Sequence, residues 1–586
     1  MTHVIATAGH VDHGKSTLIR LLTGMEPDRL AEERRRGMSI ELGFAWAALP
    51  SGQQIAFVDV PGHEQFVTTM LAGVGPVAAV MFVVAADEGW MPQSAEHLAA
   101  LHALEVRHGL LVITRSDLAD PGPAAEQARG EISSTTLAGI ETVTVSGHTG
   151  QGLQHLRHAL DRLVAAMPRP ESTAPVRMWI DRSFTINGAG TVVTGTLGAG
   201  TLRPDDQLII DDRQVTVRRL QTQGVTVDEI GPVARVAINL RGVAAGRLSR
   251  GAALLTPGHW FSTSLVDVEL RGPPAPSLPS ALTLHIGSAA VAVQVRPLGD
   301  QHARLALARP LPLHIGDQAL LRDPGGHRVI AGITMADVRP PALRRRGAAT
   351  TRGDQLASAG IPDGAVLLSW NGLMRRDELA AMGVLAPYEP VTRKWIADPT
   401  HWANLSQRLT ALTADHAARH PLEPGIPAET ARIALGLPDQ ELIRALVQPP
   451  LGLTEGRIAG AATTTLPHAV SAAVEQIRSE LTDHPFHAPD VDRLAELELH
   501  GRALAAVVRA GLLIRIAEGI VLLPGADHTA AAILARLPQP FTVSDARKAL
   551  DTTRRVAIPL LEHLDRQGHT RRNQAGQRVC DVSSTD

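Results

Sequence analysis

Short apolar runs alternate with segments of helical spacing in the first part of the chain. An apolar run at 3–9 precedes a segment at 16–24, in which leucines recur at the helical period and a glycine closes the pattern. Further apolar runs of strand length lie at 56–59 and 109–114. Because alternating strands and helices are typical of a parallel sheet covered by helices, we predict an α/β domain over 1–170.

The pattern then changes to short β-branched runs. Runs such as 178–186, 190–197 and 234–240 are separated by Gly, Pro or Asp turns, and helical periodicity fades. This pattern is typical of small β-barrels. We predict two β-barrel domains, at 172–257 and 258–341.

Helical spacing returns in the last part of the chain and recurs in short units. Four units lie roughly sixty residues apart, at 377–384, 429–437, 492–499 and 544–551. The last three precede a second helical stretch, and in two cases a β-like run follows. We predict tandem winged-helix modules at 342–405, 406–465, 466–526 and 527–586. Such modules are also common protein-interaction folds.

Two proline-containing segments are predicted to be linkers. Residues 163–175 carry three prolines, and residues 339–353 combine prolines with a cluster of three consecutive arginines. The basic cluster is typical of either a solvated joint or one that faces RNA.

Composition places the chain among multidomain globular proteins. Its 586 residues are 44% hydrophobic and 20% charged, and its net charge of −3 does not by itself indicate nucleic-acid binding. Cys580 is the single cysteine, which excludes an intramolecular disulfide and a cysteine zinc site. We find no leader and no uncharged apolar run of about 20 residues. We therefore expect a cytoplasmic protein that does not enter membranes.

The turn between the first strand and the first helix carries a P-loop pattern, Gly9-x-x-x-x-Gly14-Lys15-Ser16. Glycines let backbone N–H groups turn toward phosphates, Lys15 neutralises the terminal phosphates, and Ser16 can ligate Mg²⁺. We expect the following residues to bind the nucleotide: Gly9, His10, Val11, Asp12, His13, Gly14, Lys15, Ser16 and Thr17.

A second element of a nucleotide switch follows the strand at 56–59. Asp59 ends this strand and is positioned to hold Mg²⁺ through water, and the N–H of Gly62 can sense a γ-phosphate. Beside an intact P-loop, this role is favoured over that of a simple strand-end cap.

The strand at 109–114 leads into the residues expected to select the base. GTPases usually carry Asn-Lys-x-Asp here, where the aspartate accepts hydrogen bonds from guanine N1 and N2. Asp117 keeps that group, while Thr114 and Arg115 replace the first two residues. Threonine can still donate a hydrogen bond, and the arginine stem can still cover the base. Ser146 and Gly147 offer backbone groups to the guanine oxygen, so we predict a GTP-binding domain.

Three motifs resemble those of elongation factor Tu-like translational GTPases: GHVDHGKST at 9–17, RRRGMSIELG at 34–43 and DVPGHEQF at 59–66. The resemblance implies a GTPase that hydrolyses GTP with Mg²⁺ and is activated by the ribosome. It also implies that His63 positions the attacking water. Ser39 stands where the family usually has the threonine that binds Mg²⁺ and the γ-phosphate.

Further details of the sequence resemble one branch of that family. The short switch region, the segment DEGWMPQSAEHLAAL at 87–101 and the helical tail resemble selenocysteine-specific elongation factors of the bacterial SelB type. The resemblance implies delivery of selenocysteyl-tRNA to the ribosome at a recoded UGA codon, with the barrels clasping the aminoacylated acceptor arm.

The same resemblance implies a pocket for the selenocysteine side chain. Asp181, Arg182 and Arg235 match positions that line it, and Glu41 stands where relatives often have aspartate. A selenol is largely anionic at neutral pH while a seryl hydroxyl is not, so a cationic pocket would prefer the selenolate. Each residue alone is equally typical of an ordinary barrel surface.

The last module is the best candidate for binding RNA. Within 541–572, Ser544 is the expected N-cap of a first helix, and a second helix presents basic residues at its start. The resemblance implies that this module grips the mRNA hairpin (SECIS) downstream of the UGA codon, and such a hairpin is recognised by shape, phosphates and an exposed base. The candidates are Lys548, Arg554, Arg555, Arg571 and Arg572. Without the resemblance, exposed helix charges would explain them.

A second hypothesis belongs to a different class. A ribosome-associated GTPase whose helical tail binds protein partners would show the same P-loop and the same repeated helices. In either case we expect the chain to act as a monomer.

Overall fold

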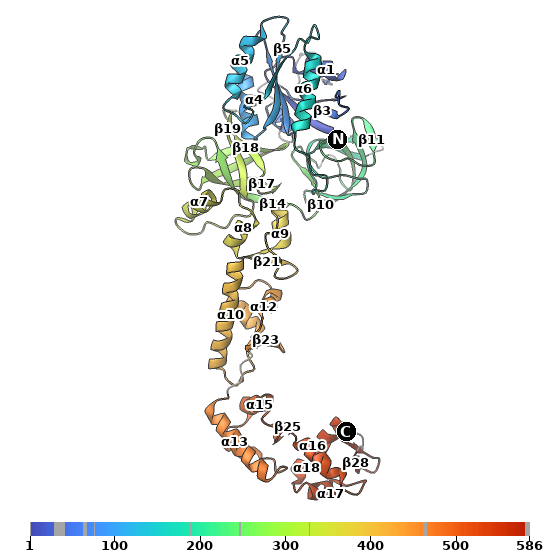
Figure 1. Ribbon diagram of the computed structural model, residues 1–586, viewed down its shortest axis with the longest axis vertical. Coiled ribbons are helices and arrows are strands. Elements are labelled where there is room, and N and C mark those ends of the chain that lie inside the picture. The colour runs from blue at the N-terminus through green and yellow to red at the C-terminus, as the bar shows by residue number, and fades with distance from the viewer. Residues whose placement is uncertain are drawn as a thin grey trace. The chain divides into compact units, whose positions relative to one another are not determined.

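The computed structural model describes residues 2–27, 41–61, 67–74, 77–186, 190–244, 246, 248–326, 328–460 and 466–580. The chain forms two compact units, Met1–Pro390 and Val391–Asp586 (Figure 1). The first unit contains an α/β domain, two β-barrels and a short helical segment. The second contains helices and small sheets in a repeating order.

The α/β domain is built on a six-stranded sheet with the order β2-β3-β1-β4-β5-β6. All neighbouring strands pair in parallel except β2, which is antiparallel to β3. The strands are β1 (Thr2–Ala8), β2 (Gly43–Ala48), β3 (Gln54–Asp59), β4 (Ala79–Ala85), β5 (His108–Thr114) and β6 (Glu141–Thr144). The helices are α1 (Lys15–Thr23), α3 (Val67–Val74), α4 (Pro92–Ala103), α5 (Pro121–Ile132) and α6 (Leu153–Ala166). The predicted α/β class is confirmed.

Helices cover both faces of this sheet. Buried side chains of α1 and α6 pack on one face, and those of α3, α4 and α5 pack on the other (Figure 1). Strand β4 is buried along its whole length because it is apolar on both faces, as a covered parallel sheet requires. The loops that follow parallel strands meet at one edge, which places the turns after β1, β3, β4, β5 and β6 together.

The second domain is a small barrel. Its strand order is β11-β10-β12-β8-β7-β13-β9, and a further pairing of β9 with β10 joins the ends, so that six strands form a ring with β11 outside it. The strands are β7 (Arg177–Ile186), β8 (Gly190–Leu197), β9 (Gln207–Ile210), β10 (Arg213–Thr222), β11 (Val225–Val227), β12 (Ala234–Arg241) and β13 (Ala253–Leu255).

The third domain is a closed barrel with the order β14-β17-β16-β15-β18-β19. Its strands are β14 (Phe261–Arg271), β15 (Ala281–Ile286), β16 (Ala289–Pro297), β17 (His302–Leu313), β18 (Gln318–Arg322) and β19 (Val329–Asp337), with a 3-10 helix η3 (Ala275–Ser277). The two predicted barrels are thus present in the order expected from the β-branched runs.

A short helical segment follows the third domain within the first unit. It contains α7 (Ala348–Ala359), α8 (Gly364–Asn371), β20 (Leu373–Arg375) and α9 (Arg376–Ala381). Arg352 of α7 is buried in the barrel, where it forms ion pairs with Asp267 and Asp337. The prediction of a linker over 339–353 is therefore wrong in its second half, because a buried ion pair holds α7 against the barrel. The linker predicted at 163–175 likewise starts too early, since α6 extends to Ala166.

The second unit repeats one arrangement: helices followed by a strand pair. Its first elements are β21 (Trp395–Ala397), α10 (Pro399–Arg419), β22 (Ile426–Pro427), α11 (Ala428–Leu435), α12 (Gln440–Leu446), β23 (Leu451–Thr454) and β24 (Arg457–Gly460). Next are α13 (His468–Asp483), α14 (Val491–Glu496), α15 (Gly501–Arg509), β25 (Ile514–Ala517) and β26 (Ile520–Leu522). The last are α16 (Ala526–Ala535), α17 (Val543–Ala549), α18 (Arg554–Gln567), β27 (Thr570–Arg572) and β28 (Arg578–Cys580).

Three helices followed by a β-hairpin make a winged helix, and this order occurs three times in the described part of the second unit, so the predicted class of tandem winged helices is confirmed. The first predicted module, 342–405, has a different order of elements, α7-α8-β20-α9-β21. Helix α10 is continuous from Pro399 to Arg419, so the boundary expected between 405 and 406 falls inside a helix. Buried apolar side chains from both of the last two modules belong to one hydrophobic cluster, which joins these modules.

Helix α17, expected from the sequence as the first helix of the last module, is its second helix and begins earlier than expected. Thr542, not Ser544, is the N-cap of α17, and it forms a capping box with Asp545. Thr542 Oγ1 accepts a hydrogen bond from the Asp545 N–H, and the Asp545 carboxylate accepts one from the Thr542 N–H. The reciprocal pair satisfies two backbone donors, which explains why threonine takes this position.

Candidate functional site

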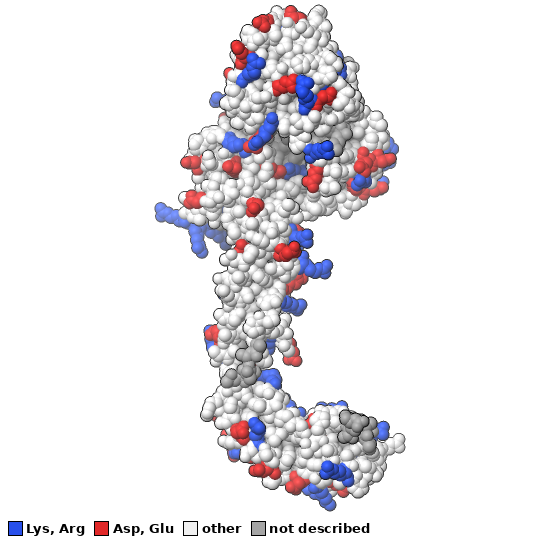
Figure 2. All heavy atoms as spheres, viewed as in Figure 1, with Lys and Arg blue, Asp and Glu red and all other residues white. Residues whose placement is uncertain are grey.

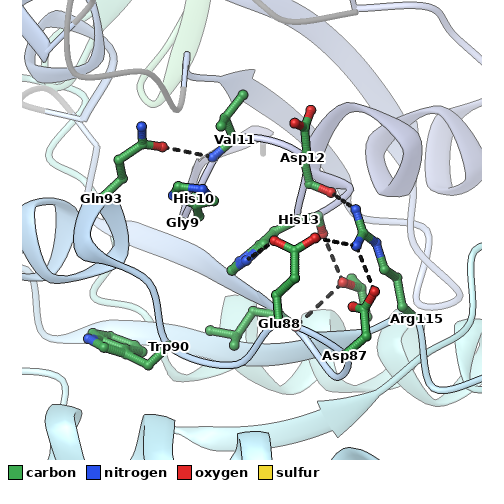
Figure 3. A network of polar contacts seen from close by, with 12 residues as sticks. Gly9, His10, Val11, Asp12, His13, Asp87, Glu88, Trp90, Gln93 and Arg115 are labelled. Atoms are coloured by element: carbon green, nitrogen blue, oxygen red, sulfur yellow. Dashed lines mark hydrogen bonds and ion pairs between the residues drawn. The ribbon is translucent and has the colours of Figure 1, made fainter. Parts of the chain in front are cut away.

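The loop between β1 and α1 needs glycine at two positions. Gly9 has φ 125°, and a Cβ there would lie 2.1 Å from the carbonyl oxygen of Val83. Gly14 has φ 84° and is the N-cap of α1. Figure 3 shows this loop with the side chains that surround it. A left-handed backbone beside a helix N-terminus leaves backbone N–H groups available to phosphate oxygens.

Lys15, Ser16 and Asp59 lie together at the carboxyl edge of the sheet. Lys15 Nζ donates hydrogen bonds to the carbonyl oxygens of Gly9 (3.0 Å) and His10 (2.6 Å). Ser16 Oγ donates to Asp59 Oδ2 at 2.6 Å, and the Asp59 side chain is buried. A hydroxyl and a carboxylate oxygen are ligands that Mg²⁺ accepts, so this pair fits the metal of a nucleotide site.

Four of the five predicted base-binding residues line one hollow of about 400 Å³: Thr114, Arg115, Asp117 and Gly147. Asp12 and Thr17 of the P-loop region line it as well, whereas Ser146 does not. Thr114 Oγ1 donates to the carbonyl oxygen of His13 at 2.8 Å, so the threonine holds the P-loop backbone.

Asp117 is oriented by its neighbour Ser146. Ser146 Oγ donates to Asp117 Oδ1 at 2.6 Å, and this hydrogen bond lowers the pKa of the Asp117 carboxyl. Ser146 Oγ also accepts the N–H groups of His148 and Thr149. The ionised carboxylate is thus presented as an acceptor, which is the form that guanine N1 and N2 require.

Arg115 is turned toward acidic side chains. Its Nη1 donates to Asp87 Oδ2 (2.9 Å) and Glu88 Oε1 (2.6 Å), and its Nη2 donates to the carbonyl oxygen of Asp12 (Figure 3). Glu88 also lies 3.4 Å from Nε2 of His13. Arg115 therefore ties the P-loop to the loop after β4.

Two residues of α4 that the sequence did not single out hold the P-loop backbone. Gln93 Oε1 accepts the N–H of Val11 at 3.1 Å, and Nδ1 of His97 accepts the N–H of Gly9 at 3.0 Å. Burial lowers the pKa of His97 to about 3, so its ring is neutral and can accept. The available signal was two polar residues four positions apart on a largely apolar helix.

Three predicted switch residues cannot be placed. Ser39, Gly62 and His63 lie outside the described residues, and so does most of the motif at 34–43.

The four residues predicted to line the selenocysteine pocket meet beside Phe44. Arg235 forms a bidentate ion pair with Asp181, and Arg182 lies 3.0 Å from Glu41. The guanidinium of Arg235 lies 3.9 Å from the centre of the Phe44 ring, and that of Arg182 lies 5.6 Å from it.

Both cations of this group face a carboxylate as well as an aromatic ring. Arg182 also donates to the carbonyl oxygen of Leu42 at 2.7 Å, which links the barrel to the strand β2 region. Arg250, which the sequence did not single out, interacts electrostatically with this group. Burial lowers the pKa of its guanidinium, Asp181 and Glu41 raise that pKa, and Arg182 lowers it.

The predicted RNA-binding residues of the last module divide into two groups. Lys548 on α17, Arg554 at the start of α18, and Arg571 and Arg572 on β27 are exposed. Arg555 instead donates hydrogen bonds to the carbonyl oxygens of Ala488 and Pro489 in the preceding module. Arg555 is exposed as well, but its guanidinium is hydrogen-bonded to the preceding module, which the sequence pattern did not indicate.

Three features together define a guanine-nucleotide-binding domain: the P-loop, the hydrogen-bonded pair of Ser16 and Asp59, and the hollow lined by Asp117. Residues 2–166 match the family model described as the Elongation factor Tu GTP binding domain. This is the domain of a translational GTPase, an enzyme that hydrolyses GTP to GDP and phosphate. Residues 532–579 match a second model, Elongation factor SelB, winged helix.

Curated relatives extend the likeness over both ends of the chain. The selenocysteine-specific elongation factor of Escherichia coli is 33% identical over 76% of this chain and 75% of its own length. The Haemophilus influenzae protein of that name is 28% identical over 97% of each chain, and that of Desulfomicrobium baculatum is 35% identical over 57% of this chain and 55% of its own length. The chain belongs to the family of selenocysteine-specific elongation factors.

Solved structures show the same fold. A crystal structure of a bacterial selenocysteine-specific elongation factor, EF-Sec, aligns with a TM-score of 0.76 over 99% of this chain and 100% of that chain, at 24% identity. The SelB structure from Methanococcus maripaludis in complex with the GTP analogue GppNHp aligns with a TM-score of 0.52 over 58% of this chain and 80% of that chain, at 22% identity. Within the described ranges, no helix has the length and apolarity needed to cross a membrane.

Proposed function

We propose that the chain, as a monomer in the cytoplasm, carries selenocysteyl-tRNA to the ribosome in complex with GTP and Mg²⁺. In this proposal its last module holds an mRNA hairpin (SECIS) beside a recoded UGA codon. The observation that supports it most strongly is that one chain joins an Elongation factor Tu GTP binding domain at 2–166 to a SelB winged helix at 532–579. Holding the charged tRNA and the hairpin in one molecule raises the local concentration of the tRNA at one codon.

The nucleotide step is assigned as follows. The P-loop and Lys15 hold the phosphates, and Ser16, Asp59 and Ser39 hold Mg²⁺. The N–H of Gly62 reports the γ-phosphate, and His63 positions the attacking water. Asp117 selects guanine, and Thr114, Arg115, Ser146 and Gly147 complete the base site. The described geometry supports the P-loop and base parts of this assignment.

The amino-acid pocket is assigned to the group beside Phe44. A selenolate would compete with Asp181 and Glu41 for the guanidinium groups of Arg235 and Arg182, because it is an anion and a seryl hydroxyl is not. The side chain of Arg182 is 36% exposed, whereas that of Arg235 is 15% exposed, so Arg182 is the more accessible cation.

The hairpin site is assigned to the exposed basic residues of the last module. Arg554, Arg571 and Arg572 form no ion pair with any residue that the structure describes, and Lys548 lies on the adjacent helix α17. The recognition helix of a helix-turn-helix pair, α18 in this module, commonly meets nucleic acid through its N-terminal residues, and in other proteins strands do so. Arg555 is expected to act by holding this module against its neighbour.

Filter binding of the GTP-loaded protein to selenocysteyl-tRNA and to seryl-tRNA tests the proposal. We expect at least a tenfold preference for selenocysteyl-tRNA. Arg182→Gln should reduce that preference, because it removes the accessible cation. Arg203→Gln is the matched control, since Arg203 forms an exposed ion pair with Glu229 elsewhere on the same barrel. Equal binding of the two tRNAs by the unaltered protein would remove the selenocysteine assignment and leave the GTPase intact.

Binding of the hairpin separates this function from the alternative in which the tail binds proteins. We expect the full chain to bind the hairpin, and the combined substitution Arg571→Gln and Arg572→Gln to weaken that binding without affecting GTP binding. Retained affinity in this variant would show that the wing does not contact the RNA.

A further inference from the structure

Two histidines lie in the loop between α13 and α14, in the module that precedes the last one. His484 and His487 are exposed, and their rings are stacked, with centroids 4.9 Å apart and an angle of 18° between the ring planes. Among the described residues, neither imidazole has an ion-pair or hydrogen-bond partner. The nucleotide site, the proposed amino-acid pocket and the predicted RNA-binding residues do not include this pair.

This loop is bonded to the last module where α18 begins. Thr552, in the turn before α18, donates a side-chain hydrogen bond to the carbonyl oxygen of Phe486. Arg555, in the first turn of α18, donates to the carbonyl oxygens of Ala488 and Pro489. The bonded carbonyl groups lie on both sides of the second histidine in the chain. The stacked pair is therefore held next to the N-terminal end of α18.

The backbone of the loop is fixed without a partner. Phe486, Ala488 and Pro489 are buried, so the loop is anchored on the protein by its own residues. The N–H of His487 donates to the carbonyl oxygen of His484 at 3.0 Å, which closes a turn between the two histidines. Because the turn and the anchors already set the positions of the rings, a partner that binds them loses little free energy to ordering the loop.

Aromatic side chains are scarce in the last two modules. Residues 466–580 contain no tryptophan and no tyrosine, and their two phenylalanines, Phe486 and Phe541, are buried. The exposed aromatic rings of this part are therefore imidazoles. A second histidine pair, His528 and His569, meets edge to face, so its rings share no plane that a further ring could extend. The stacked pair is thus the better platform for a flat ligand.

The charges around the stacked pair do not favour a phosphate. Asp483 and Asp490 flank the loop, and Asp551 is exposed in the turn before α18. On the face of the second unit drawn in Figure 2, acidic and basic side chains are interspersed where α13 ends and where α17 and α18 lie. The pair therefore offers an RNA its ring faces, and the phosphate contacts are left to the arginines of the last module.

We infer that His484 and His487 extend the hairpin site onto the preceding module, where their stack receives an exposed base of the mRNA hairpin. The inference rests on the proposed function and deepens it. Bases that are splayed out of an RNA hairpin stack on aromatic side chains, among them histidine. The position of the loop selects this RNA, because Arg554 is exposed at the same end of α18, and a phosphate bound there leaves an adjoining base beside the loop.

The test measures binding of the full chain to an RNA hairpin copied from the mRNA segment downstream of a UGA codon that the host reads as selenocysteine. The first variant is His484→Ala, His487→Ala, and the second is His484→Tyr, His487→Tyr, which keeps two aromatic rings. The control is His468→Ala. His468 is an exposed histidine at the other end of α13, a 16-residue helix about 24 Å long.

The alanine variant should bind the hairpin about tenfold more weakly, in keeping with the loss of one stacked base. The slope of log K against log salt should stay unchanged, because no phosphate contact is removed. The tyrosine variant should bind within about threefold of the unaltered protein, since a ring still stacks. Binding of GTP and of selenocysteyl-tRNA should be unchanged in all variants.

Hairpins in which one loop nucleotide at a time lacks its base locate the contact. At one position, loss of the base should weaken binding to the unaltered protein about tenfold and should cost the alanine variant nothing further. Additive losses at every position would mean that the histidines do not stack on a base of the loop.

The inference is also refuted if the alanine variant binds as the unaltered protein does, if His468→Ala loses as much affinity, or if the salt slope falls. In each of these cases the unaltered protein still binds the hairpin, so the proposed function stands without the histidine contact. If the unaltered protein does not bind the hairpin at all, the proposed hairpin site fails and the extension fails with it.

Discussion

Arginine stands at position 115, where related GTPases usually carry lysine, and its contacts explain how the base site accommodates it. The guanidinium donates hydrogen bonds to Asp87, to Glu88 and to the Asp12 carbonyl oxygen. Its planar group fixes the directions of these hydrogen bonds, whereas the ammonium group of a lysine, at the end of a flexible chain, would not. Arg115 therefore stabilises the P-loop from the side of the base.

Arg115→Ala should lower the affinity for GDP by about tenfold. The substitution removes charge-assisted hydrogen bonds, each worth about 1.5–3 kcal/mol before solvent screening, and leaves Asp87 and Glu88 beside the P-loop without Arg115 as their cation. Arg115→Lys should lose less affinity, because the charge remains. Titration with a fluorescent GDP analogue measures both effects. Arg162→Ala is the control, because Arg162 forms an exposed ion pair with Glu141 on the surface between α6 and β6. An unchanged affinity for GDP in Arg115→Ala would contradict the expectation.

Helix α4 is the element that connects the P-loop with the third barrel. Gln93 and His97, near its first turns, hold the backbone of the P-loop. At its other end, the carbonyl oxygen of Ala103 accepts a hydrogen bond from Nη2 of Arg271 at 2.9 Å. The close fit depends on Gly332, where a Cβ would lie 2.4 Å from that carbonyl oxygen. Helix α4 thus contacts the P-loop near one end and the third barrel at the other.

The buried histidines near this helix predict a pH dependence of stability. Burial lowers the pKa of His97 to about 3 and that of His13 to about 4, from 6.5 in the unfolded chain. Below pH 6.5 the unfolded chain binds protons that the folded chain does not, so stability is lost as pH falls. Each such group contributes a slope of up to about 1.4 kcal/mol per pH unit.

Urea unfolding of the full chain at pH 7 and pH 5 measures this dependence. His97→Gln should show a smaller loss between the two values, because glutamine can still accept the Gly9 N–H through its amide oxygen but does not titrate. His158→Gln, an exposed residue on α6, should behave as the unaltered protein does. An identical pH dependence in His97→Gln and the unaltered protein would exclude His97 as a source of the effect.

At the scale of the whole molecule, a buried ion network attaches the start of the tail to the third barrel. Asp267 accepts hydrogen bonds from both Arg304 and Arg352, and Asp337 is held by Arg352. Burial raises the pKa of Asp337 although Arg352 opposes that shift. The carboxylates tolerate burial only while the arginine is present.

Arg352→Met should therefore destabilise the first unit by about 3–5 kcal/mol, since it leaves the buried Asp337 without its cation and leaves Asp267 with Arg304 alone. Hydrogen exchange of α7 should accelerate, because the helix loses its attachment. Arg339→Met offers a comparison: its exposed pair with Glu378 should contribute no more than about 1 kcal/mol. Denaturant titration combined with hydrogen exchange measures both, and equal effects of the two substitutions would show that the buried network is not the attachment.

The last two winged-helix modules should unfold as one unit. Their side chains share a single cluster, and Thr552 and Arg555 of the last module bond carbonyl oxygens of Phe486 and Ala488 in the preceding one. A fragment covering 466–580 should melt in one cooperative transition followed by circular dichroism. A fragment starting at residue 527 should melt at a lower temperature, because it loses the apolar partners contributed by 466–526. Two separate transitions in the longer fragment would indicate independent modules.

Local interactions explain which features could be predicted from the sequence alone. The P-loop needs glycine at positions 9 and 14 because of backbone conformation and close approach, and the strands β1, β3 and β5 follow from continuous apolar runs. Residues such as Lys15, Ser16 and Asp59 could be named because their spacing from those elements is short and regular. The order of domains along the chain follows from the change from helical to β-branched patterns.

Contacts between distant parts of the chain were decided only by the tertiary structure. Arg115 meets Asp87 and Arg235 meets Asp181 across strands and loops, and no local pattern encodes these partners. The same holds for His97 at the P-loop, for Arg352 in the barrel and for Arg555 at the preceding module. The sequence determines which side chains are charged or apolar, whereas folding determines which of them are brought close enough to pair and which, like Arg344 to Arg346, stay exposed.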